Sequence, residues 1–125
     1  RANAIATFTG ESASDYLGVG VAPIDFDGDG VEDVMIGAPG QDQGGPNAGK
    51  AYLFYGPILS TVTTDDAAVR MNGGTGDQAG EFLAGVGDVD GDGIPDVLID
   101  SSYDDEGGTY AGASWLVLGS HLLAP

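Results

Sequence analysis

The chain has 125 residues, of which 20 are acidic and three are basic, giving a formal net charge of −17. This charge argues against binding to nucleic acid or to an anionic membrane, because both are attracted to basic surfaces. The absence of cysteine excludes disulfide bonds and thiol chemistry, and no apolar run is long enough for membrane insertion.

The predicted elements are short strands separated by turns. Helical periodicity is absent over any useful length, and 23 glycines and six prolines suit many tight turns. We therefore predict an all-β chain without helices. The expected strands, in chain order, are Ala4–Thr9, Gly18–Ile24, Asp33–Gly37, Lys50–Tyr55, Ala67–Met71, Leu83–Gly87, Asp96–Asp100 and Ala113–Leu118.

An acidic nonapeptide of the form D-x-D-x-D-G-x-x-D follows the second expected strand and returns after the sixth. Four carboxylates in nine residues repel one another unless a cation binds, and hard oxygen ligands of this kind suit Ca²⁺. We predict two structural Ca²⁺ ions per chain. The expected ligands are the side chains of Asp25, Asp27, Asp29 and Asp33 with the carbonyl of Val31, and those of Asp88, Asp90, Asp92 and Asp96 with the carbonyl of Ile94.

The spacing of these loops differs from that of an EF-hand. An EF-hand loop has a bidentate Glu at position 12, where this chain has Ile36 and Ile99. The residues that follow each loop are apolar and β-prone. Each loop is therefore expected to lead into a strand rather than a helix.

The two loops belong to a longer internal repeat of 63 residues. Sliding the chain by this offset gives 15 identical pairs between positions 25 and 56. We therefore describe residues 1–125 as one segment made of two repeats, 1–62 and 64–125. A period near 60 residues with strand-like content is typical of a propeller or another repeat array.

The acidic loops and the residues around them resemble the FG-GAP repeat family, which forms the blades of integrin α-subunit β-propellers. Leu17-Gly18 stands at the Phe-Gly element of that family, and Gly37-Ala38-Pro39 forms a complete Gly-Ala-Pro element. The second repeat departs from the pattern, with Ala79-Gly80 and Asp100-Ser101-Ser102 at these places. The departures put blade-edge packing in question there.

The resemblance implies two β-propeller blades of four antiparallel strands, in the order 4-1-2-3-4-1-2-3 along the chain. It also implies an extracellular or cell-surface location and a structural, adhesive or protein-interaction role without enzymatic activity. Because the chain begins at Arg1 with no signal peptide, we expect a mature form or an excised segment.

Two blades cannot close a propeller, which needs about four to eight. The ring is therefore completed by a longer parent chain or by several copies of this one. We favour a homotrimer of six blades, in which Ala4–Thr9 of one copy completes the blade Leu83–Leu118 of its neighbour.

One further loop is a candidate binding site for an extracellular protein or a glycan. It contains Tyr103, Asp104, Asp105, Glu106 and Tyr110 and is expected on the face opposite the acidic loops. A calcium-dependent, lectin-like carbohydrate-binding module is therefore the alternative function. An enzyme is the third class, but no acid-base pair lies outside the acidic loops, and His121 is the only histidine.

Overall fold

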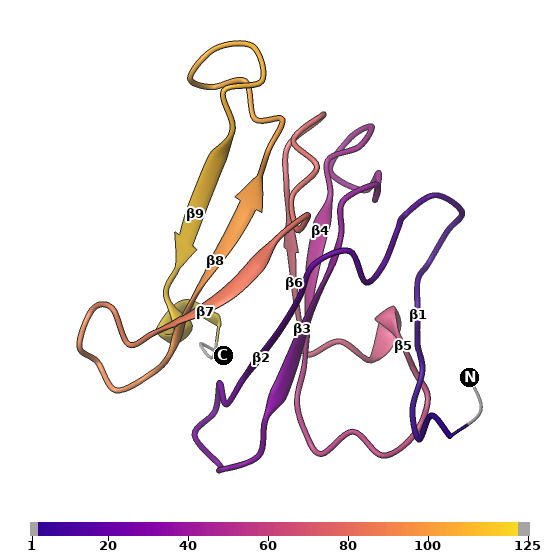
Figure 1. Ribbon diagram of the computed structural model, residues 1–125, viewed down its shortest axis with the longest axis vertical. Helices are drawn as coiled ribbons and strands as arrows, with labels where there is room; N and C mark the ends of the chain where they lie inside the picture. Colours follow the sequence, from indigo (N-terminus) through magenta and orange to yellow (C-terminus); the bar gives the residue numbers. More distant parts are fainter. Residues whose placement is uncertain (1–2, 123–125) are drawn as a thin grey trace.

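The computed structural model describes residues 3–122; residues 1–2 and 123–125, the ends of the predicted segment, lie outside this range. Strands are the main regular structure of the described part, and they form a four-stranded and a three-stranded sheet (Figure 1), with a small two-stranded sheet of β1 and β5. The fold class is therefore all-β, as predicted. The elements are β1 (Phe8–Thr9), β2 (Val21–Ile24), β3 (Asp33–Ala38), β4 (Lys50–Phe54), β5 (Val62–Thr63), η1 (Thr64–Asp66), β6 (Val69–Asn72), β7 (Leu83–Gly87), β8 (Asp96–Ser101), β9 (Ala113–Val117) and α1 (Gly119–Leu122).

The first sheet has four antiparallel strands in the order β2-β3-β4-β6. Its central strands β3 and β4 are buried on both faces. Because side chains alternate along a strand, Met35 and Leu53 lie on one face, while Ile36 and Tyr52 lie on the other. The sheet therefore has apolar packing on both sides.

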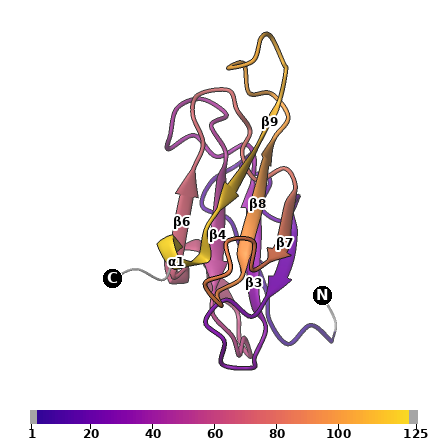
Figure 2. The same ribbon diagram turned by 90° about the vertical axis from the view of Figure 1, so that its left-hand side faces the viewer.

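The second sheet has three antiparallel strands in the order β7-β8-β9. Its residues Val97 and Ile99 share a buried cluster with Met35 and Leu53 of the first sheet, and Trp115 packs against this cluster. The two sheets thus pack face to face, and Figure 2 shows them from the side of β9. Burial of this apolar surface, at roughly 25 cal/mol per Å², is the main force that joins them.

The N-terminal segment covers the other face of the first sheet. Phe8 packs edge-to-face on Phe54, with ring centroids 5.0 Å apart, and Leu17 packs against the same cluster. The strand expected over Ala4–Thr9 is only Phe8–Thr9, and it pairs in parallel with β5 of its own chain. Residues 62–63, expected in a connection, are therefore a strand.

Two other expectations need correction. The strand predicted from Gly18 begins at Val21, because Gly18 has a φ of +101°, which is not a strand conformation. The chain also has helical turns at η1 and α1, where no helix was expected. Each has only three or four residues and is too short to show helical periodicity.

Candidate metal centres

Each acidic loop joins the first and second strands of its sheet. Residues 25–32 connect β2 to β3, and residues 88–95 connect β7 to β8. Both loops lie at the same end of the molecule, and the connections from β3 to β4 and from β8 to β9 lie at the opposite end (Figure 1). Glycines with positive φ, among them Gly28 and Gly91, allow the sharp turns within the loops.

In the first loop the structure brings together Asp25, Asp27 and Asp29. One carboxylate oxygen from each lies within 4.8 Å of the others. Backbone amides fix their orientation: Gly30 N donates to Asp25 Oδ2 at 3.0 Å, and Val31 N donates to Asp29 Oδ1 at 2.8 Å. The fourth predicted side-chain ligand, Asp33, is not part of this group.

The second loop groups Asp88, Asp90 and Asp96 by the same distance criterion, and Asp92 is not part of this group. Gly91 N and Asp92 N donate to Asp88 Oδ1 at 2.8 and 3.0 Å. The two loops therefore have similar backbone bonding, although different members of the predicted sets converge.

The aspartate at the ninth loop position has a structural role that the sequence analysis did not predict. Asp33 is fully buried; its Oδ2 accepts from Phe26 N and its Oδ1 from Gly56 N, both at 2.8 Å. Asp96 does the same with Val89 N at 2.7 Å and Gly119 N at 2.8 Å. Each carboxylate therefore ties its acidic loop to the end of the sheet's third strand.

Three of the loop aspartates have shifted pKa values. The bond from Gly119 N is the main reason why the pKa of Asp96 lies below its ordinary value. Asp96 therefore stabilises the fold at pH values above that ordinary range, and this contribution is lost as the pH falls through the lowered pKa. Desolvation by the loop, followed by the neighbouring charges of Asp29 and Asp33, raises the pKa of Asp27, and the pKa of Asp90 is raised in the same way.

One atom shows that the first loop suits a cation. Asp25 Oδ1 is buried and has no hydrogen-bond donor among the described residues. An unpaired buried carboxylate oxygen is costly, and it lies in a group of three carboxylates whose like charges repel. The donors are all hard oxygen atoms, which suit Ca²⁺ or Mg²⁺ rather than zinc or copper.

A family model for the FG-GAP repeat matches residues 17–54 and 79–117, which together make up more than half of the chain. The chain belongs to the FG-GAP repeat family. Each matched stretch begins before the first strand of one sheet and ends with its third strand.

The FG-GAP chain is also similar to integrin α subunits. It is 32% identical to integrin alpha-6 of Homo sapiens over 101 residues, 80% of this chain and 9% of the relative. Integrin alpha-PS2 of Drosophila melanogaster is 32% identical over 107 residues, 80% of this chain and 8% of the relative. Integrin alpha-IIb of Mus musculus is 32% identical over 103 residues, 75% and 10% respectively. The FG-GAP chain thus spans about a tenth of the length of these relatives.

The candidate ligand loop of the second FG-GAP repeat lies at the end opposite the acidic loops (Figure 1). Tyr103 and Tyr110 meet edge to face, with centroids 5.5 Å apart, and both are exposed. Asp104 is buried, however, and accepts a bond from Glu106 N at 2.8 Å, while Asp105 accepts one from Tyr110 N at 2.6 Å. These two aspartates shape the loop, and of the five predicted residues only Asp104 is buried, so the tyrosines, Asp105 and Glu106 are exposed.

The first FG-GAP repeat contains a buried polar cluster that was not predicted from the sequence. Lys50 is 1% exposed; its Nζ donates to Gln43 Oε1 and lies 3.8 Å from Glu11 Oε1. Tyr52 Oη donates to Glu11 Oε1 at 2.8 Å, and Gln41 Nε2 donates to Glu11 Oε2 at 3.2 Å. The sequence does carry one sign of this cluster, because Lys50 is the single charged residue in an otherwise apolar strand.

Charge and hydrogen bonding within this cluster explain two shifted pKa values. Partial burial by itself favours the protonated form of Glu11, but the bond from Tyr52 and the charge of Lys50 outweigh it and lower the pKa. Burial and the bond to Glu11 raise the pKa of Tyr52. Glu11 is therefore a carboxylate that attaches the N-terminal segment to the first sheet.

Among the helices of residues 3–122, none has the length and apolar character needed to cross a membrane.

Proposed function

We propose that the chain is a calcium-binding FG-GAP β-propeller module with a structural, adhesive or protein-interaction role outside the cell or at its surface. The unpaired buried oxygen Asp25 Oδ1, within its group of three carboxylates, is the observation that carries the calcium assignment. The similarity to integrin α subunits supports the adhesive role.

The proposed Ca²⁺ ions are structural and not catalytic. All side-chain ligands of each site come from one hairpin, so a bound ion would hold the first two strands of a sheet together. His121 lies in α1, which adjoins the second loop through the bond from Gly119 N to Asp96, but neither acidic loop contains a histidine. A metal-bound water would therefore lack an evident general base.

Calorimetry should detect two Ca²⁺ per chain, with dissociation constants of roughly 0.1–1 mM as in other extracellular modules. At about 2 mM free Ca²⁺ and ~0.1 mM affinity, each ion should add about 2 kcal/mol to the free energy of unfolding. Asp27→Ala and Asp90→Ala should each remove one ion. Fewer than two ions in the wild-type chain, or equal competition by Mg²⁺, would contradict the assignment.

The same titrations should depend on pH. Because the pKa values of Asp27 and Asp90 are raised, these groups take up protons first as the pH falls. Protons then compete with the cation, so calcium affinity should weaken on acidification. An affinity that does not weaken as the pH falls into the ordinary titration range of aspartate, about pH 4, would contradict ligation by these two carboxylates.

We further propose that the module closes its propeller by head-to-tail assembly, with three chains and six blades. The second sheet has three strands where the first has four, so the outer edge of β9 has no partner strand among the described residues. A strand edge of this kind is a site for pairing with another chain. The N-terminal strand of a neighbouring chain would supply the fourth strand, and for this Phe8–Thr9 would exchange its pairing with β5 of its own chain for the edge of β9.

A carbohydrate-binding module is the second candidate, and the exposed Tyr103–Tyr110 pair favours it. Aromatic faces of this kind suit contact with sugar rings. We expect a lectin of this type to bind glycans on an array in the presence of Ca²⁺ and to lose binding in Tyr103→Ala and Tyr110→Ala. Tyr16→Ala, which removes an equally exposed tyrosine elsewhere, is the control. No calcium-dependent binding by the wild-type chain would rule out this candidate.

A further inference from the structure

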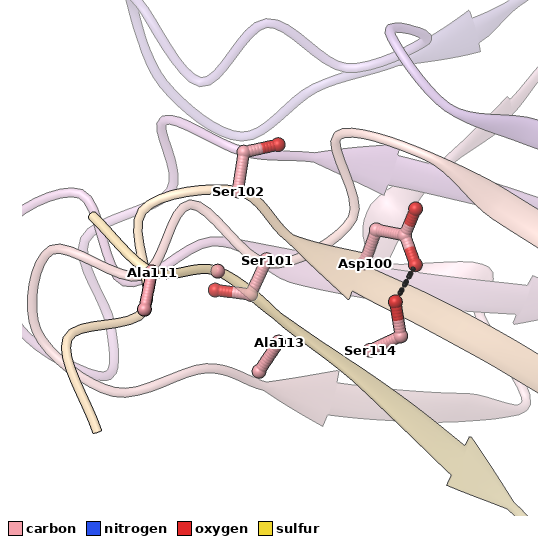
Figure 3. Close-up of a pocket in the computed structure, with 7 residues that line it drawn as sticks. Asp100, Ser101, Ser102, Ala111, Ala113 and Ser114 are labelled. Carbon is pink, nitrogen blue, oxygen red and sulfur yellow. Dashed lines mark hydrogen bonds between the residues drawn. The ribbon is translucent and has the colours of Figure 1, made fainter. Parts of the chain in front are cut away.

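A polar pocket lies at one end of the second sheet (Figure 3). Asp100 and Ser114 alternate with Ile99 and Trp115, which face the first sheet, so this pair is on the opposite face. Within it, Ser114 Oγ donates to Asp100 Oδ1 at 2.5 Å. The side chains of Asp100 and Ser114 lie on adjacent strands, β8 and β9. The pocket is lined by Asp100, Ser101, Ser102, Ala111, Gly112, Ala113 and Ser114.

The residues that stand 63 positions before the pocket residues form the equivalent surface of the first repeat. This surface is already covered. The linker between β6 and β7, residues 73–82, lies on it: Ala79 N donates to Ala48 O at 3.0 Å, and Gly49 forms a parallel bridge with Ala79. Ala48 and Ala51 are consequently fully buried, whereas their counterparts Ala111 and Ser114 are exposed. The pocket is therefore the uncovered copy of a linker-binding surface.

The N-terminal segment contains a turn with the backbone conformation of this linker. Ser14, Tyr16 and Gly18 have φ values of +66°, +57° and +101°. The linker shows the same alternation, with +84°, +55° and +89° at Gly76, Gln78 and Gly80, respectively. Three positive φ values at alternate positions are an unusual pattern, especially at residues other than glycine.

This turn also sits on its own sheet in the same way. Gly18 N donates to Gly37 O at 2.9 Å, and Gly80 N donates to Asp100 O at 3.1 Å. The linker makes a second set of bonds to the preceding repeat, whereas the turn at residues 14–18 has no preceding repeat in the structure. Its Tyr16 is 65% exposed.

We propose that the pocket of one chain binds the turn Ser14–Gly18 of a second copy, with Leu17 in the place of Ala79. Leu17 N would then donate to Ala111 O of the other copy, and Tyr16 N to Tyr110 O. Tyr110 is suited to this bond, because its φ of +52° matches the +50° of Asn47, which accepts from Gln78 N at 2.9 Å. The inference rests on the proposed head-to-tail assembly and assigns its contact site.

The contact joins separate molecules, because the pocket lies on the second sheet, whereas Leu17 of the turn packs on the face of the first sheet that is turned away from the second. Among the described residues, nothing covers the pocket residues Ala111 and Ser114, and Tyr16 of the turn is also exposed. Such heterologous contacts form a closed ring when the rotation between subunits closes.

One pocket residue fits the incoming turn less well than its counterpart. A Cβ at Gly37 would lie 1.8 Å from Gly80 O, so the linker needs a glycine there. Asp100 occupies this position in the second repeat. The incoming turn must therefore sit farther out near Asp100, and Asp100→Gly should strengthen association.

Cysteine cross-linking tests the contact, since the chain has no native cysteine. A Leu17→Cys chain mixed with an Ala111→Cys chain under mild oxidation should form a covalent dimer. Thr61→Cys, at another exposed position, replaces Leu17→Cys in the control mixture. Adding Asp100→Gly to the Ala111→Cys chain should raise the cross-linked fraction several-fold. A chain that carries both Leu17→Cys and Ala111→Cys should give a closed particle of about 37.5 kDa from three 12.5 kDa chains.

The outcomes separate this contact from the proposals on which it rests. Cross-linking no faster than the control, in a chain that light scattering shows to be oligomeric, overturns the pocket contact and leaves head-to-tail assembly standing. A 12.5 kDa monomer at every concentration, with and without Asp100→Gly, overturns both. Calorimetric calcium binding by the same samples reports separately on the calcium module.

Discussion

Replacing Asp33 with alanine should destabilise the fold more than removing any other carboxylate of the first acidic loop. The substitution leaves Phe26 N and Gly56 N without their acceptor at the end of the first sheet. Each buried amide left unpaired costs about 1–3 kcal/mol, so the total is roughly 2–6 kcal/mol. A domain of this size has about 5–15 kcal/mol of stability, and we expect partial or complete unfolding.

The measurement is urea denaturation in excess chelator, which removes any contribution from a bound cation. Asp27→Ala is the matched control, because Asp27 is exposed and its carboxylate contacts only the amide of Asp29 in the same loop, at 3.2 Å. In chelator, Asp27→Ala should unfold close to the wild-type midpoint. Equal losses in the two variants would contradict the anchoring role of Asp33.

Glu11→Ala should have the second largest effect, because it removes the counter-charge of a buried lysine. Lys50 is 1% exposed, and its Nζ lies 3.8 Å from Glu11 Oε1. Breaking a buried pair typically costs about 3–5 kcal/mol. Glu11 is itself 31% exposed, so we expect a loss nearer ~2–3 kcal/mol.

A double-mutant cycle separates the charge from the other contacts of Glu11. Lys50→Met removes the charge and keeps much of the apolar side-chain volume, and the second repeat already has Ala113 at this position. The double variant Glu11→Ala/Lys50→Met should therefore be more stable than Glu11→Ala alone. If adding Lys50→Met to Glu11→Ala lowers stability further, the burial of an unpaired charge is not the cause.

The features that depend on neighbouring residues could be predicted from the sequence. The acidic loops and the strands that follow them are encoded within short stretches, and the 63-residue offset is found by comparing the chain with itself. Carboxylate spacing, glycine positions and alternating apolar residues act locally. The resemblance to the FG-GAP family rested on these same short motifs, and the family match covers the residues that carry them.

Tertiary structure decided how individual loop residues are used. Asp27 and Asp33 are both aspartates in one nonapeptide, yet Asp27 is exposed and Asp33 is fully buried. The difference arises because Gly56, 23 residues away in sequence, brings its amide to Asp33 at the end of the third strand. Asp104 likewise looked like a surface residue and is buried within its own loop.

The placement of the N-terminal segment also depended on distant contacts. Its sequence indicated a strand over Ala4–Thr9, but local patterns do not specify which edge or face a segment will bind. Phe8 packs on Phe54, and Glu11 accepts a bond from Tyr52, 41 residues later. The sequence by itself therefore determined the repeats, strands and acidic loops, because these follow from local spacing. Only the tertiary structure decided which carboxylates anchor the sheets and which surfaces remain open, because burial depends on residues that are far apart in the chain.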